Sequence, residues 1–145
     1  MSTGRLPAAL GVVLLVGHVT VALWATAGLV ELTSPPWPWP AVANPDLPTA
    51  VLLVHWPLML ATGTVFVAGY LRRWPATPAA MAACYAALAT MCAVETFGFL
   101  TGRFRFVDMT VEYAAYAVLL ALLNRAPLRD RFHTGGGTAA ELRHT

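Results

Sequence analysis

The chain has 145 residues, of which 58% are hydrophobic and only 11% are charged. Because a soluble domain carries about 25% charged residues, this composition argues against a soluble globular protein. The net charge of +2 is small and lies mostly between the apolar runs, which argues against nucleic acid as a partner.

Four long apolar runs cover most of the chain, at residues 6–30, 50–70, 78–100 and 107–123. Each is close to the ~20 residues that an α-helix needs to cross ~30 Å of hydrocarbon. The sequence therefore predicts an all-α integral membrane protein, a four-helix bundle over residues 1–124. The first run exceeds the about 7–15 apolar residues of a signal peptide, which favours a span that is retained.

The arginines are distributed unevenly over the segments that flank these runs. With four spans, seven of them share one side: Arg5, Arg72, Arg73, Arg125, Arg129, Arg131 and Arg143. Only Arg103 and Arg105 lie on the other side. The positive-inside rule then places both termini in the cytoplasm of a multi-pass protein of the cell membrane. The absence of Lys indicates the codon bias of a GC-rich genome, so we expect a bacterial inner membrane.

The segment 31–49 between the first two runs holds six prolines, which disfavour a helix and favour extended chain. Trp37 and Trp39 in this outer loop have two interpretations. They anchor the loop at the lipid headgroups, where Trp is enriched, or they form a lid that contacts a lipophilic ligand or a partner subunit. At the other end of the chain, the polar and glycine-rich residues 125–145 predict a flexible cytoplasmic tail.

Ionisable side chains inside apolar spans are costly, so they are candidate functional groups. The candidates are His18, His55, Glu95, Asp108 and Glu112, and Tyr116 continues the last two at i+4 spacing. With the predicted topology, all of these except His18 gather in the outer half of the bundle. Arg103 and Arg105 lie next to them, in the short outer loop.

Three interpretations of this outer cluster remain open. In the first, Arg103 or Arg105 pairs with a carboxylate and only fixes the hairpin, with Asp108 favouring the start of the last helix. In the second, His55, Glu95 and Glu112 are catalytic groups in a pocket, with Glu95 abstracting a proton beside His55. In the third, the cluster contacts another subunit.

Cofactor patterns are weak. Haem held by His18 and His55 is disfavoured, because their predicted depths differ by about 9 Å along the helices. Paired Glu-x-x-His motifs and H-E-x-x-H are absent, so no metal site is predicted. Cys84 and Cys92 are eight residues apart, about 12 Å along a helix, which is too far for a disulfide within it.

Two functional hypotheses follow. The first is an accessory or partner-binding component of a membrane complex, favoured by the small size and the absence of a recognisable catalytic motif. The alternative is a membrane-embedded enzyme or redox protein that acts on a lipophilic substrate through the outer cluster. A transporter is a third hypothesis, and four spans would require an oligomer for it. The expected partners are the lipid bilayer, a membrane protein or second copy of the chain, and a lipophilic small molecule.

Overall fold

The structure, a computed structural model, describes residues 5–34, 46–126 and 128–133. Helices make up 85% of these residues, and no strand occurs among them. The helices are α1 (Arg5–Thr33), α2 (Thr49–Arg72), α3 (Thr77–Gly98), α4 (Arg105–Leu123) and α5 (Leu128–His133).

The first four helices coincide with the four predicted apolar runs, and their ends differ from the prediction by a few residues. Each is long and apolar enough to cross a membrane. Their Ala- and Leu-rich composition favours helix, and Pro78 lies in the first turn of α3, where a missing N–H costs nothing. The prediction of an all-helical chain with four long apolar helices is therefore confirmed.

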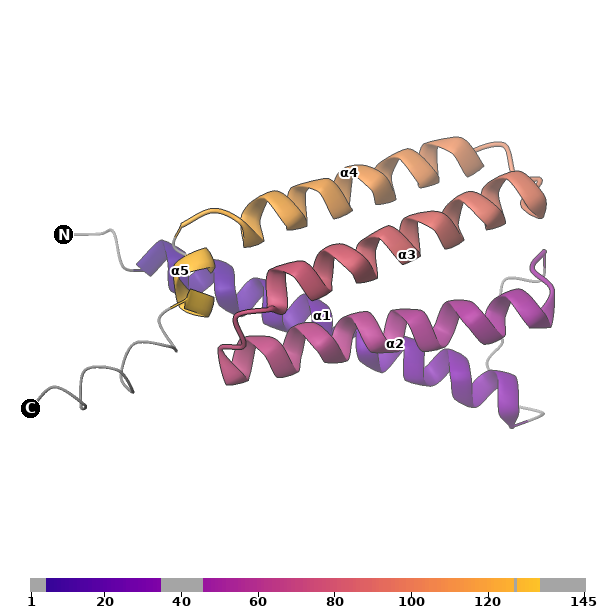
Figure 1. Ribbon diagram of the computed structural model, residues 1–145. Coiled ribbons are helices and arrows are strands. Elements are labelled where there is room, and N and C mark those ends of the chain that lie inside the picture. Colours follow the sequence, from indigo (N-terminus) through magenta and orange to yellow (C-terminus); the bar gives the residue numbers. More distant parts are fainter. Residues whose placement is uncertain (1–4, 35–45, 127, 134–145) are drawn as a thin grey trace, which may run out of the picture.

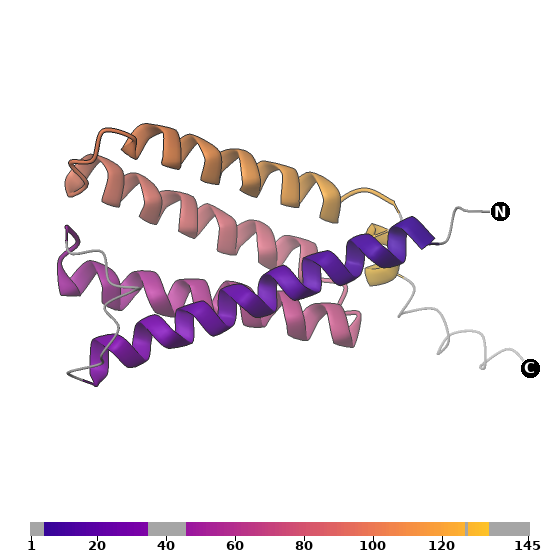
Figure 2. The same ribbon diagram turned by 180° about the vertical axis from the view of Figure 1, so that it is seen from behind.

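Helices that are neighbours in the chain pack on one another: α1 on α2, α2 on α3, and α3 on α4. Figures 1 and 2 show that α1 crosses α2 diagonally, whereas α2, α3 and α4 run closer to parallel. The start of α1, the α2–α3 turn and α5 lie at one end of the molecule, which we call the α5 end. The α3–α4 connection lies at the opposite end, which we call the loop end.

Two glycines allow the close approach of α1 and α2. A Cβ atom on Gly63 would lie 2.7 Å from the His18 carbonyl oxygen and 2.9 Å from the Ala22 Cβ. A Cβ atom on Gly28 would overlap the Trp56 ring at 2.4 Å. Gly63 thus lets the two backbones come nearly into contact, as in other apolar helix pairs, and Gly28 makes room for the Trp56 ring.

The α5 end is closed by a core of fully buried side chains. Phe66, Met81, Leu123 and Phe132 have at most 1% of their surface exposed and come from α2, α3, α4 and α5. The Arg131 guanidinium of α5 lies 4.0 Å from the centre of the Tyr70 ring, and its Nη2 donates a 3.4 Å hydrogen bond to the Tyr70 carbonyl. Helix α5 therefore fills the end of the array between the other helices.

This packing of α5 differs from the expected flexible tail over 125–145. Six residues are too few to show a helical period in the sequence, but Leu128 and Phe132 are spaced by four and point to one face. Both are buried, at 3% and 0% exposure. The rest of the predicted tail, from 134 onward, lies outside the described residues.

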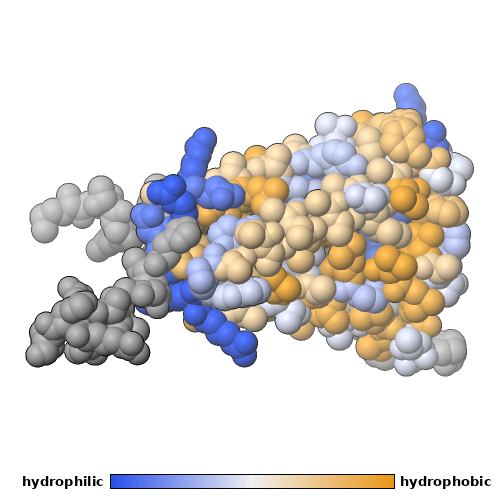
Figure 3. All heavy atoms as spheres, in the orientation of Figure 1, coloured by the Kyte–Doolittle hydropathy of each residue, from blue (hydrophilic) through white to orange (hydrophobic). Residues whose placement is uncertain are grey.

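The outward surface between the two ends is mainly apolar. Figure 3 shows hydrophilic residues gathered at the α5 end of this face and hydrophobic ones along its middle. Large side chains such as Val13, Leu23, Val111 and Val118 are more than half exposed. Such a surface matches hydrocarbon surroundings rather than water.

We predict that Gly63→Ala lowers the stability of the protein in detergent by about 1–3 kcal/mol, the usual cost of overpacking a close contact. The added methyl group meets backbone atoms of α1, which cannot move aside as a side chain would. Gly98→Ala is the control, since a Cβ atom there meets nothing within 4 Å. Thermal unfolding of both variants measures the difference, and equal melting temperatures would contradict the close crossing.

Candidate functional site

A cleft of about 570 Å³ lies between the α1–α2 pair and the α3–α4 pair, and all four long helices line it. Its volume falls in the range of about 300–1,000 Å³ that is typical of small-molecule sites. Most of the wall is apolar, with residues such as Val13, Val21 and Leu119. A few polar side chains reach this wall, and they form three hydrogen-bonded groups.

The first group is a histidine–carboxylate pair near the loop end. His55 Nδ1 of α2 lies 2.6 Å from Glu95 Oε1 of α3. The Glu95 side chain is 10% exposed and the His55 side chain is 23% exposed. Of these two residues, His55 lines the cleft and Glu95 does not. Glu95 therefore lies behind the imidazole as seen from the cleft.

The geometry of this pair determines which nitrogen of His55 is available. A carboxylate only accepts hydrogen bonds, so Nδ1 donates its proton to Glu95. Nε2 is then the remaining polar atom of the ring, and no described residue forms a hydrogen bond to it. Such an imidazole accepts a proton or a hydrogen bond at Nε2 when neutral and donates one when protonated.

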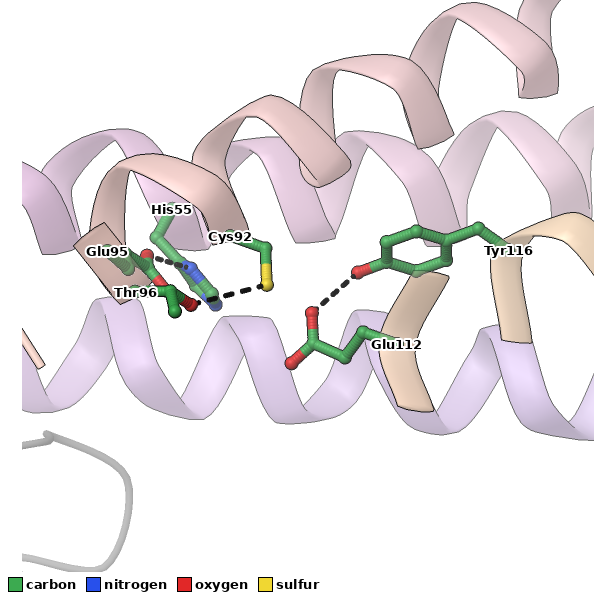
Figure 4. Close-up of polar contacts among 6 residues, drawn as sticks. All are labelled: His55, Cys92, Glu95, Thr96, Glu112 and Tyr116. Carbon is green, nitrogen blue, oxygen red and sulfur yellow. Dashed lines mark hydrogen bonds and ion pairs between the residues drawn. The ribbon is translucent and has the colours of Figure 1, made fainter. Parts of the chain in front are cut away.

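The second group comes from α4. The Tyr116 hydroxyl donates a 3.1 Å hydrogen bond to Glu112 Oε2, one turn away on the same helix face. Both residues line the cleft. Figure 4 shows the Cys92 thiol between this group and the His55–Glu95 pair, and its Sγ lies 4.0 Å from the Thr96 hydroxyl. The Cys92 thiol, which is only weakly polar, therefore separates the His55–Glu95 pair from the Glu112–Tyr116 pair.

The third group lies deeper, near the middle of the helices. His18 Nδ1 donates a 2.7 Å hydrogen bond to the Leu14 carbonyl, so Nε2 accepts the 2.7 Å hydrogen bond of the Tyr85 hydroxyl. The His18 ring stacks on Phe66 at 3.8 Å between centroids. The Tyr85 ring stacks on Tyr116 at 5.2 Å. These ring contacts connect the deep group to the Glu112–Tyr116 group across the cleft.

The structure thus brings together His55 and Glu95, and Glu112 and Tyr116, as two adjacent pairs. Asp108 is exposed in the first turn of α4 and does not line the cleft. Within the described part of the chain, neither Arg103 nor Arg105 forms an ion pair with a carboxylate.

The two arginines of the loop end contact other groups instead. Arg105 Nη1 donates a hydrogen bond to the Leu100 carbonyl, and its guanidinium lies 4.7 Å from the centre of the Phe106 ring. The Arg103 guanidinium lies 5.8 Å from the centre of the Phe104 ring. These contacts keep the short α3–α4 connection together without neutralising the acidic groups of the cleft.

Sequence reasoning missed Tyr85 and did not assign Cys92 to the site. A signal was present, because Tyr85, Leu88, Cys92 and Glu95 follow the 3–4–3 spacing of one helix face. The structure buries all four. Trp37 and Trp39, the expected lid residues, lie outside the described residues.

The fit of haem to His18 and His55 can be examined from their hydrogen bonds. His18 Nε2 already accepts a hydrogen bond from Tyr85, and Nδ1 donates to Leu14. An axial bond to iron would have to displace one of them, so His18 does not fit this role as it stands. Among the described residues, no three His, Cys, Asp or Glu side chains lie together as a metal site would need.

Comparison of the chain with models of protein families, with curated proteins and with solved structures finds no match. The functional argument therefore depends on the cleft and the side chains in its wall.

We predict that Tyr85→Phe destabilises the protein by about 1–3 kcal/mol, because it leaves His18 Nε2 buried without a donor. Tyr113→Phe is the control: it removes a hydroxyl that donates to the Ala89 carbonyl at the exposed surface, and we expect a smaller loss. Thermal unfolding of both variants in detergent measures the two losses. If Tyr113→Phe lowers the stability as much as Tyr85→Phe does, the hydrogen bond between Tyr85 and His18 does not stabilise the protein more than one at the surface.

Proposed function

We propose that α1–α4 form a membrane-spanning bundle with both termini in the cytoplasm. The length and apolar character of the four helices support four crossings. The arginine distribution supports the orientation, since Arg72, Arg73 and Arg125 flank the ends of α2 and α4 at the α5 end. The loop end then faces outward. The two acidic pairs, His55–Glu95 and Glu112–Tyr116, then lie in the outer half of the bilayer.

The orientation predicts that peptide tags on both termini are protected in right-side-out membrane vesicles. An added protease should remove neither tag until detergent opens the vesicles, because both lie on the inner side. Removal of either tag from intact vesicles would contradict the topology. A periplasmic tag on a known membrane protein serves as the positive control for protease access.

Within this bundle, we propose that the cleft binds a lipophilic small molecule with a polar head. The observation that carries this proposal is the position of two hydrogen-bonding groups, His55 and Glu112–Tyr116, in the wall of a mainly apolar cleft. A polar group inside a membrane protein is expensive unless it has a partner or a function. An apolar wall with few convergent polar groups is the usual form of a small-molecule site.

The arrangement of His55 and Glu95 also supports proton exchange with the bound molecule. Glu95 accepts the hydrogen bond of the Nδ1–H group and so orients the ring, as the carboxylate does in other histidine–carboxylate pairs. His55 Nε2 is then the candidate general base or acid, and Glu95 is a positioning residue. This assignment exchanges the roles that the sequence suggested for these two residues.

The small-molecule function is preferred to the accessory or partner-binding component that the sequence favoured. In the component hypothesis, an arginine would neutralise Glu95 and the helices would need no cleft. Instead, Glu95 pairs with His55 and the cleft is present. A transporter is also less favoured, because it would need a path through the whole molecule. The core of Phe66, Met81 and Phe132 closes the α5 end.

We predict that Gly17→Leu abolishes retention of the bound molecule without destabilising the protein. Gly17 lines the cleft, and a Cβ atom there meets nothing within 4 Å, so a leucine side chain has room to occupy space at the cleft wall. Leu is also about 1 kcal/mol more favourable than Gly within a helix. Mass spectrometry of organic extracts from protein isolated in native lipid discs measures the retained molecule.

The matched control is Gly98→Leu, which adds the same side chain at another open position that does not line the cleft. It should retain what the wild-type protein retains. An extract of Gly17→Leu identical to that of the wild type would contradict the binding role of the cleft.

A further inference from the structure

We infer that the ligand of the cleft is an uncharged lipid whose head is a planar ring with oxygen substituents, of the quinone and hydroquinone class. This inference rests on the proposed function, because it names the chemical class of the molecule in the same cleft. Three features of the wall carry it: its rings, its hydrogen-bonding groups and its charge.

Aromatic rings from all four long helices line the cleft. Trp24 of α1, Trp56 of α2, Tyr85 of α3 and Tyr116 of α4 all contribute to its wall. Trp24 is 49% exposed, so part of its surface is accessible at the cleft wall. Flat side chains favour stacked or edge contacts with another flat ring over contacts with a flexible acyl chain.

The hydrogen-bonding groups in the wall can both accept and donate. His55 Nε2 accepts when the ring is neutral and donates when it is protonated. The Tyr116 hydroxyl donates to Glu112 in the structure, and it can turn its proton to a ligand or accept from one. A quinone offers two accepting oxygens and a hydroquinone offers two donating hydroxyls, so groups of this kind suit both forms of one molecule.

The charges around the cleft disfavour a charged head. No arginine among the described residues lines it, and the acidic residue in its wall is Glu112, so a phosphate head would find no basic partner there. A lipophilic cation would use Glu112 but would gain nothing from His55, and the protonated form of that imidazole would repel it. An uncharged, oxygen-bearing head uses both groups.

The shape of the cleft provides room for the chain of such a lipid. Val13 and Trp24, at the two ends of the wall on α1, are eleven positions apart, about 16 Å at ~1.5 Å per residue. The polar groups on α2 and α4 lie toward the loop end of this length, and Val13, Leu14 and Leu119 line the other end. The ring therefore lies toward the loop end, and its apolar chain extends toward the α5 end or out between the helices.

The test is a binding titration of the full-length protein in discs of synthetic phospholipid. The probes are a benzoquinone with a decyl chain, its hydroquinone, farnesol as a ring-free lipid alcohol, and tetraphenylphosphonium as a lipophilic cation. Native mass spectrometry counts the bound molecules, and Gly17→Leu reports the binding that does not involve the cleft. We expect the quinone and the hydroquinone to bind saturably, with an affinity at least tenfold higher than that of farnesol. Gly17→Leu should lose this binding.

Tyr116→Phe tests the hydrogen-bonding part of the inference. It keeps the ring and its stacking on Tyr85 but removes the hydroxyl, so quinone affinity should fall roughly three- to tenfold, the effect of one lost hydrogen bond. Tyr113→Phe is the matched control, because Tyr113 does not line the cleft, and its quinone affinity should equal that of the wild type.

The other outcomes each overturn a defined part of the account. Farnesol bound as tightly as the quinone would overturn the ring-bearing head and leave the lipid-binding cleft in place. Tighter binding of tetraphenylphosphonium would overturn the uncharged head. If none of the probes binds the wild-type protein above the level of Gly17→Leu, both this inference and the proposed function fail.

Discussion

His18 holds α1 to two neighbouring helices at once, and the arrangement of the helices toward the loop end depends on that attachment. Its carbonyl oxygen lies against Gly63 of α2, and its side chain accepts a hydrogen bond from Tyr85 of α3 while stacking on Phe66. Helix α1 is thereby fixed at its middle and crosses α2 diagonally. This crossing leaves the space between α1 and α4 that becomes the cleft.

The molecule is divided along its length by this attachment. Toward the α5 end, the rings of Phe66, Tyr70 and Phe132 fill the interior, and Arg131 covers Tyr70. Toward the loop end, the interior contains the two acidic pairs and an open cleft. A closed apolar half and an open polar-lined half fit the proposed binding of a small molecule, since a path through the whole length would need polar groups or space in both halves.

Ionisable groups in an apolar interior need partners, and the two acidic residues of the site meet this need differently. Glu95 is buried and pairs with the imidazole of His55, whereas Glu112 is exposed and has the Tyr116 hydroxyl and the Cys92 thiol as partners. The pair with the stronger partner is therefore the more enclosed one. The more exposed carboxylate stands at the cleft, where it is open to a ligand.

Much of the fold could be predicted from the sequence, because spans of hydrocarbon length leave little choice of secondary structure. The i+4 spacing of Glu112 and Tyr116 and the similar depth of His55 and Glu95 were also sufficient to place these residues in one region. The contact of His18 with Tyr85 was not predictable, since the two residues are 67 positions apart and meet only because of how α1 crosses α2. Helix α5 escaped prediction for a different reason: six residues carry too little periodicity, and its stability comes from burying Phe132.

The most direct measurement is a crystal structure of the protein grown in a lipidic mesophase supplemented with a decyl-chain quinone. The account predicts elongated non-protein density between α1 and α4, with an oxygen within hydrogen-bond distance of His55 Nε2 or of the Tyr116 hydroxyl. A structure in which α1 packs directly against α4, with Gly17 in contact with that helix and no space between them, would contradict it.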